Sequence, residues 1–185
     1  TLVLVCGLSV ASAGCGYVNM LKARMAFQDA NALYASQDYR GAKAKYEEAI
    51  VLAESDAGPA GAYFFVANSA DNLYRPARKG MPENDALLTT AVTNYKKAAE
   101  TSVNPTIKKR AIEYLVAAYN DPDKLNDPGQ AEPLIQSMIN MDPSDPTNYF
   151  ALSRIYEDNG DYEQAEAQLL KAKAAKPSRS EEHTS

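Results

Sequence analysis

The chain has 185 residues, of which 45% are hydrophobic and 23% are charged, and its formal net charge is −5. This composition is typical of a folded protein long enough to bury a core, and it excludes a disordered chain. The acidic balance disfavours non-specific nucleic-acid binding. Both cysteines, Cys6 and Cys15, lie at the N-terminal end, so the remainder has neither a disulfide framework nor a thiolate metal site.

The N-terminal stretch TLVLVCGLSVASAG is an uncharged apolar run that ends in small residues. It is shorter than the about 20 residues that span a bilayer, but it fits the core of a signal peptide. We therefore expect residues 1–14 to be a signal peptide without its start, followed by a linker or helix start at 15–22. Two processing sites compete. Ala11-Ser12-Ala13 fits simple secretion, whereas Ser12-Ala13-Gly14-Cys15 resembles a bacterial lipobox, with Ser12 where Leu is usual.

The lipobox resemblance implies that Cys15 is acylated. Acylation would anchor the protein in the cell envelope, at the periplasmic face of the outer membrane. It would also explain why a cysteine is present here and nowhere later in the chain. The alternative is cleavage after Ala13, which would release a periplasmic or secreted protein.

Residues 23–178 repeat a helix-turn-helix pattern, which is clearest in the last unit. Its characteristic positions hold Tyr149, Leu152, Ser153, Tyr156, Gly160, Tyr162, Ala165, Leu169, Ala172 and Pro177. They resemble the tetratricopeptide pattern W-x2-L-G-x2-Y…A-x3-F…P of about 34 residues, with Tyr149, Ser153 and Leu169 replacing Trp, Gly and Phe. The resemblance implies an all-α fold, a right-handed α-solenoid of about four repeats, and a protein that binds other proteins.

The same positions recur earlier and predict units at 23–58, 59–104, 105–145 and 146–178. Successive aligned alanines, Ala42, Ala91, Ala131 and Ala165, are 49, 40 and 34 residues apart. The second and third units therefore carry insertions, in LYRPARKGMPEN and NDPDKLNDPG. A small alanine at these positions allows two helices to approach closely. Pro133 lies inside a predicted helix, so we expect that helix to start late or to bend.

The family resemblance further implies a concave groove lined by the first helix of each unit. There we expect a peptide or helix of a partner, held by aromatic anchors beside polar residues; exposed helix faces without a ligand are the competing interpretation. The predicted groove residues are Arg24, Phe27, Asn31, Tyr34, Phe64, Asn68, Asp71, Asn72, Arg110, Glu113, Asn120, Phe150, Arg154, Glu157 and Asp158, with Phe27, Tyr34, Phe64 and Phe150 as anchors. We predict no carboxylate clamp, because Phe27 and Phe64 stand where a basic residue would be needed.

Catalytic motifs are missing from the repeat region. It has no histidine and no cysteine, which removes the usual catalytic base and the common zinc ligands. The stretch DPDKLND lacks the glycine of a calcium loop. Arg75, Arg78 and Lys79 form the strongest basic cluster, for which a solvated loop is the default and an anionic partner or lipid headgroup the alternative. We expect no enzyme activity, cofactor, metal, small-molecule substrate or nucleic-acid partner.

The terminal stretch RSEEHTS, residues 179–185, holds the only histidine, His183. It matches the translation of a common sequencing-library adapter, so we expect a non-native tail; a natural polar tail is the alternative. The leading hypothesis is a non-enzymatic envelope scaffold. Its rivals are a secreted helical oligomerisation module and the repeat portion of a larger protein with a further domain, such as an enzyme.

Overall fold

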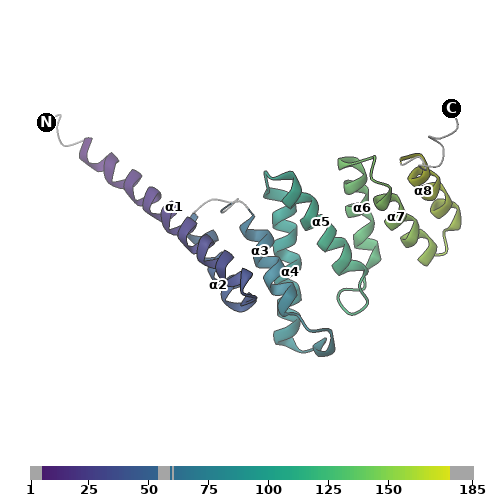
Figure 1. The fold of residues 1–185 in the computed structure, drawn as a ribbon, viewed down its shortest axis with the longest axis horizontal. Coiled ribbons are helices and arrows are strands. Elements are labelled where there is room, and N and C mark those ends of the chain that lie inside the picture. The colour runs from purple at the N-terminus through teal and green to yellow at the C-terminus, as the bar shows by residue number, and fades with distance from the viewer. Residues whose placement is uncertain (1–5, 54–58, 60, 176–185) are drawn as a thin grey trace. The chain divides into compact units, whose positions relative to one another are not determined.

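The computed structural model describes residues 6–53, 59 and 61–175. Within these ranges the chain forms eight α-helices and one short 3-10 helix, and it forms no strand. The elements are α1 (Cys6–Ala35), α2 (Tyr39–Ala53), α3 (Ala62–Leu73), η1 (Pro76–Arg78), α4 (Pro82–Thr101), α5 (Pro105–Asn120), α6 (Pro128–Met141), α7 (Pro146–Asp158) and α8 (Tyr162–Ala175) (Figure 1). The predicted all-α class is confirmed.

The chain divides into two compact units, residues 1–111 and 112–185, and the division falls within α5. In the first unit α1 packs on α2, α2 on α3 and α3 on α4. In the second unit α6 packs on α7 and α7 on α8. Within each unit these helices thus pack on their neighbours in the sequence, as in a chain of helix hairpins.

Small residues lie buried where the helices pack. Ala42, Ala91, Ala131 and Ala165, the aligned alanines of the repeat pattern, are all at most 2% exposed. A larger side chain at such a site would force the helices apart, and overpacking of this kind typically costs about 1–3 kcal/mol. The structure therefore buries all four of the repeated alanines.

Aromatic rings fill the space that the alanines leave in the first unit. The Tyr46 ring is fully buried, and the rings of Phe27 and Phe65 each lie 5.3 Å from it, centroid to centroid. The Phe27 pair is edge-on and the Phe65 pair is stacked. Such pairs contribute about 0.5–1.5 kcal/mol each beyond the area they bury. This cluster joins α1, α2 and α3.

Helix α6 does not start late. It begins at Pro128, directly after Asp127, and continues through Pro133 to Met141. A proline is well suited to the first position of a helix, where its missing N–H would have no partner. That first proline sets the start of the helix, and Pro133 only removes one hydrogen bond further along.

Helix α1 runs from residue 6 to residue 35, so it includes the predicted lipid site at Cys15. The side chains of residues 6–15 are not among those described, and residues 1–5 and the predicted tail at 179–185 also lie outside the described part. None of the described helices combines the length and the apolar character that crossing a membrane requires.

Candidate partner-binding groove

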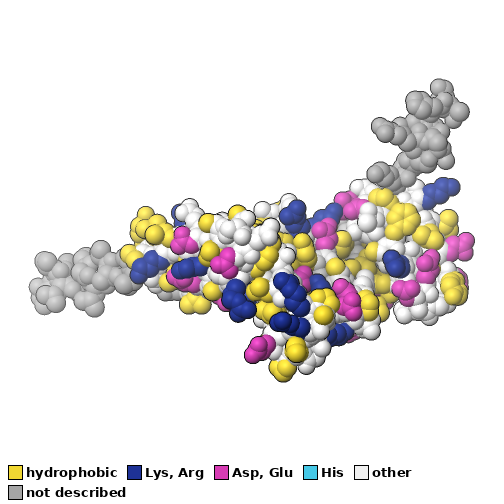
Figure 2. Space-filling model, turned by 60° about the horizontal axis from the view of Figure 1, so that its bottom comes forward, with side chains coloured by type: hydrophobic (Ala, Val, Ile, Leu, Met, Phe, Trp, Pro, Cys, Tyr) yellow, Lys and Arg dark blue, Asp and Glu magenta, His cyan; other side chains and the backbone are white. Residues whose placement is uncertain are grey.

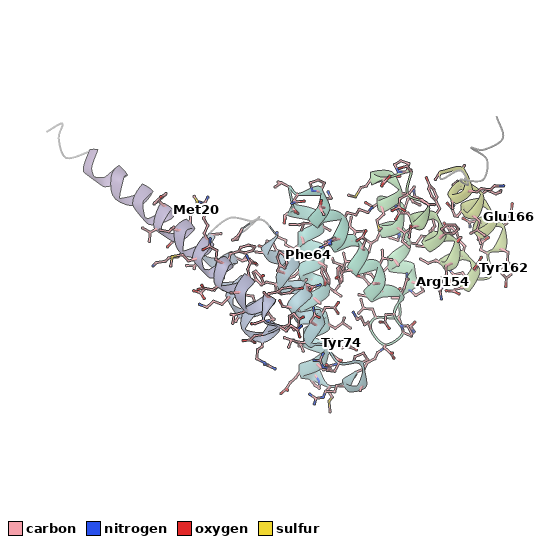
Figure 3. All side chains as sticks on the ribbon, viewed as in Figure 1. Met20, Phe64, Tyr74, Arg154, Tyr162 and Glu166 are labelled. Atoms are coloured by element: carbon pink, nitrogen blue, oxygen red, sulfur yellow. The ribbon has the colours of Figure 1, made fainter. Side chains whose placement is uncertain are left out.

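The aromatic anchors predicted in the first unit belong to its core. Phe64 is only 5% exposed, and its ring lies 5.4 Å from that of Phe65 and 5.7 Å from that of Tyr95 (Figure 3). Phe27 and Tyr34 are partly buried against the cluster around Tyr46. The prediction that Phe64 anchors a partner is therefore wrong, because neighbouring rings already cover it.

The amides predicted to face the groove in the first unit bond to tyrosines or to each other instead. Tyr34 Oη donates to Asn68 Oδ1, and Asn68 Nδ2 donates to Tyr95 Oη at 3.1 Å. Asn72 Nδ2 donates to the carbonyl oxygen of Asn68 at 2.8 Å and to its Oδ1 at 2.9 Å. Since Asn68 is 5% exposed, it is the centre of a buried polar chain from α1 through α3 to α4.

The remaining predicted groove residues of this unit, Asn31, Arg24 and Asp71, differ in their contacts and exposure. Asn31 Oδ1 accepts a hydrogen bond from Tyr46 Oη at 2.7 Å. Burial raises the pKa of Tyr46 to about 12, and the neighbouring Tyr34 adds to the effect. Arg24 is exposed and Asp71 is partly buried. The first unit thus uses most of its predicted groove residues to hold its helices together.

The second unit carries an open groove of about 820 Å³. Four predicted groove residues line it, namely Asn120 of α5 and Phe150, Arg154 and Asp158 of α7. Arg110, Glu113 and Glu157 are exposed on α5 and α7 but do not line it. The complete lining is Ala117, Asn120, Asp121, Asn126, Pro128, Thr147, Phe150, Ala151, Arg154, Ile155, Asp158 and Asn159.

Helix α7 presents one face to this groove and another to the core. Asp145 precedes the helix, and its carboxylate accepts a hydrogen bond from the Thr147 N–H at 3.0 Å, which fixes where α7 begins. From that start the groove residues follow at helical spacing. On the core side Leu152 is 1% exposed, whereas Phe150 is 52% exposed. The Phe150 ring is thus available to a partner.

A hydrogen bond between α6 and α7 holds α7 in place. Tyr156 Oη donates to Glu132 Oε1 at 2.7 Å. This hydrogen bond raises the pKa of Tyr156, so the tyrosine stays protonated and can donate throughout the physiological range. The groove residues of α7 therefore lie on a helix whose position is fixed by α6.

The connection between α5 and α6 supplies part of the wall that the repeat pattern does not predict. Asn126 has a left-handed φ of 52°, a conformation that asparagine tolerates better than most residues. The backbone folds back on α5, because Leu125 N–H donates to the Ala118 carbonyl at 3.1 Å and Asp127 N–H donates to the Tyr119 carbonyl at 2.7 Å. This folding makes Asp121 and Asn126 lining residues. In the sequence, the insertion NDPDKLNDPG was the feature that could have indicated these two lining residues.

The groove combines an apolar surface with one cation, two carboxylates and several amides. Phe150 offers apolar contact, and amides such as Asn120 can bond to a peptide backbone. Arg154 (Figure 3) forms no ion pair with a described carboxylate, so its guanidinium can receive one from a ligand. The part of the chain that the structure describes contains no group of three or more metal-ligating acidic, cysteine or histidine side chains.

Comparison with known proteins supports the repeat assignment. Residues 124–183 match a tetratricopeptide repeat family model. A solved structure described as "Crystal structure of MamA" has a TM-score of 0.59 with this chain at 15% sequence identity, over 83% of this chain and 77% of that one. No curated protein matches the sequence. The shared fold confirms the predicted α-solenoid of tetratricopeptide type.

Proposed function

We propose that this chain is a non-enzymatic scaffold that binds a peptide or helix of a partner protein in the groove of its second unit. One observation carries the proposal: Asn120, Phe150 and Arg154, from two helices, line the same open groove. The match of residues 124–183 to tetratricopeptide repeats supports a protein as the ligand.

The chemistry of the groove favours a peptide with an apolar side chain beside an acidic one. Phe150 is 52% exposed. Because fully burying an exposed phenylalanine side chain contributes about 1.5–3 kcal/mol, covering the exposed part of Phe150 contributes about half of that. Arg154 lies one helical turn further along α7 and can pair with a carboxylate in a two-bond geometry. The volume of about 820 Å³ is sufficient for a few side chains.

The test selects ligands without assuming their identity. A library of random peptides of about 12 residues is displayed on phage, selected on the immobilised full chain, and the enriched peptides are measured by fluorescence polarisation. We expect the double change Phe150→Ala with Arg154→Ala to weaken binding at least about tenfold, because it removes the apolar and the ionic contact together.

A matched control uses an exposed aromatic and an exposed cation outside the groove. Tyr162, which is 72% exposed, and Lys171 both lie on α8 and do not line the groove. The double change Tyr162→Ala with Lys171→Ala should leave the affinity within about twofold. Selection of no peptide, or an equal loss in both double variants, would contradict groove binding.

We further propose that the scaffold works in the cell envelope through a lipid on Cys15. The support is Ser12-Ala13-Gly14-Cys15 and the apolar stretch before it. Expression of the full gene in a bacterium with a radioactive fatty acid tests this: wild type should be labelled and Cys15→Ser should not. Equal labelling of the two proteins would exclude Cys15 as the acylated residue, and labelling of neither would favour release after Ala13.

A further inference from the structure

A second hollow, of about 540 Å³, lies in the first unit and is lined by three arginines. Arg40 comes from α2, whereas Arg75 and Arg78 come from the connection between α3 and α4, at the bottom of Figure 1. We call it the arginine pocket, and its full lining is Arg40, Leu73, Arg75, Arg78, Glu83, Asn84 and Leu87. Figure 2 brings this side of the structure forward and shows Lys and Arg side chains gathered beside hydrophobic ones.

The pocket is built on a fixed backbone. Asn84 is 6% exposed, its Oδ1 accepts from the Arg75 N–H at 2.8 Å, and its Nδ2 donates to the Arg75 carbonyl at 3.0 Å. One amide side chain of α4 thus pairs with both backbone groups of Arg75. On the far side of η1 the Gly80 N–H donates to both carboxylate oxygens of Asp85 at 3.1 Å. The connection is therefore held at both ends.

Arg75 is oriented by the carbonyls next to it. Its Nη1 donates to the Asn72 carbonyl at 2.7 Å and to the Tyr74 carbonyl at 3.1 Å. These bonds engage one edge of the guanidinium and leave the charge without a counter-ion. A guanidinium has five N–H donors in a planar fork, so donors remain for a ligand.

The carbonyl bonds at the end of α3 give Arg75 a structural role, but no contact of the described residues accounts for the charges of Arg40 and Arg78. Arg40, Arg75 and Arg78 are exposed and form no ion pair with any carboxylate in the described part of the chain. Arg40 is the second residue of α2, where the helix dipole disfavours a cation. Gathering like charges also costs energy unless an anion offsets them. In a chain of net charge −5, this local concentration of cations indicates a binding site.

We propose that the arginine pocket binds an acidic peptide segment of a partner protein. Guanidinium groups pair with carboxylates through two parallel hydrogen bonds, and Leu73 and Leu87 offer an apolar wall for a neighbouring side chain. Glu83 also lines the pocket. It would repel a compact, multiply charged phosphate group but can accept a backbone N–H of a peptide. The mixed lining therefore favours a peptide over a bare anion.

The test uses a defined pair of probes on the full chain. The first is a fluorescein-labelled peptide of about 12 residues in which Asp-Glu alternates with Leu-Gly, and the second has Asn-Gln in place of Asp-Glu. We expect the acidic peptide to bind and the amide peptide not to bind. In Arg40→Gln with Arg78→Gln, the Kd of the acidic peptide should rise at least about tenfold.

A charge-matched control separates the pocket from the general field of the protein. Lys22 on α1 and Lys171 on α8 are exposed and lie outside the pocket. The variant Lys22→Gln with Lys171→Gln has the same net charge as the pocket variant, and its Kd should stay within about twofold of wild type, since exposed charges at a distance are screened. Circular dichroism and thermal melting establish that both variants fold.

Four outcomes would overturn the proposal. The acidic peptide could fail to bind, or it could bind both double variants equally. Inorganic phosphate could displace it as well as unlabelled peptide does, which would make the pocket a simple anion site. Vesicles of phosphatidylglycerol could bind wild type but not the pocket variant while the peptide does not bind, which would assign the arginines to a membrane surface. None of these outcomes bears on the groove proposal for the second unit, which is tested by separate variants.

Discussion

Replacing Asn68 by alanine should destabilise the first unit more than any other amide substitution in it. The side chain of Asn68 makes three hydrogen bonds, to Tyr34 Oη, Tyr95 Oη and Asn72 Nδ2, and it is 5% exposed. The net value of one such bond is about 0.5–1.5 kcal/mol, and a buried group that loses its partner costs more. The loss in free energy of unfolding should therefore be about 2–4 kcal/mol.

The comparison is Asn94→Ala, because Asn94 bonds only to the Thr90 carbonyl of its own helix, at 2.9 Å. This change should cost at most about 0.5 kcal/mol. Urea unfolding followed by far-ultraviolet circular dichroism measures both. A double-mutant cycle of Asn68→Ala with Tyr34→Phe should give a coupling of at least about 0.5 kcal/mol, since the two groups share a bond. Additive losses, or equal losses for Asn68 and Asn94, would refute the buried polar chain.

Two further predictions concern the same unit. Burial raises the pKa of Tyr46 to about 12 from about 10 in an unfolded chain. The contribution of the protonated hydroxyl to stability is therefore complete below pH about 10 and is lost as pH rises towards 12. In parallel urea titrations over that range, Tyr46→Phe should show a smaller decline in the free energy of unfolding than wild type, and equal declines would contradict this prediction. Gly61→Ala should cost about 2 kcal/mol in urea unfolding, because φ is 86° and the new Cβ would lie 2.9 Å from Ile107 Cδ1. Its control, Gly80→Ala, has φ of 90° and open space around it, so it should cost only about 1 kcal/mol; equal costs would show that the contact with Ile107 is unimportant.

Repeat spacing predicts which helical positions are buried, but not which groove positions remain open. Val66 and Leu152 occupy equivalent positions in α3 and α7, and they are 0% and 1% exposed. Two residues earlier in each helix, Phe64 is 5% exposed and Phe150 is 52% exposed. The pattern fixes the face of the helix in both cases. Coverage of that face depends on neighbouring side chains, here the ring of Tyr95, and the pattern contains no information about them.

Insertions are the other part that sequence spacing does not predict. The repeat alignment predicts NDPDKLNDPG and LYRPARKGMPEN as extra residues. It offers a solvated loop or an anionic partner for the basic cluster of the second, and it does not predict which helix residues lie beside either stretch. The structure folds the first so that Asp121 and Asn126 line the groove, and it places Arg75 and Arg78 of the second beside Arg40. Arg40 and Arg78 are 38 positions apart in the sequence, so only the helix packing brings them together.

Internal hydrogen bonding explains why the two candidate sites lie where they do. A ligand that entered the predicted groove of the first unit would have to displace Tyr34 or Tyr95 from Asn68, and each bond lost without replacement would cost about 1 kcal/mol or more. Arg154 in the groove and Arg40 in the arginine pocket carry no such cost, because neither forms an ion pair with a described residue. Their charges can therefore be used in full for a partner. The amides and tyrosines of the first unit therefore serve stability, and we propose that Arg40 and Arg154 serve recognition.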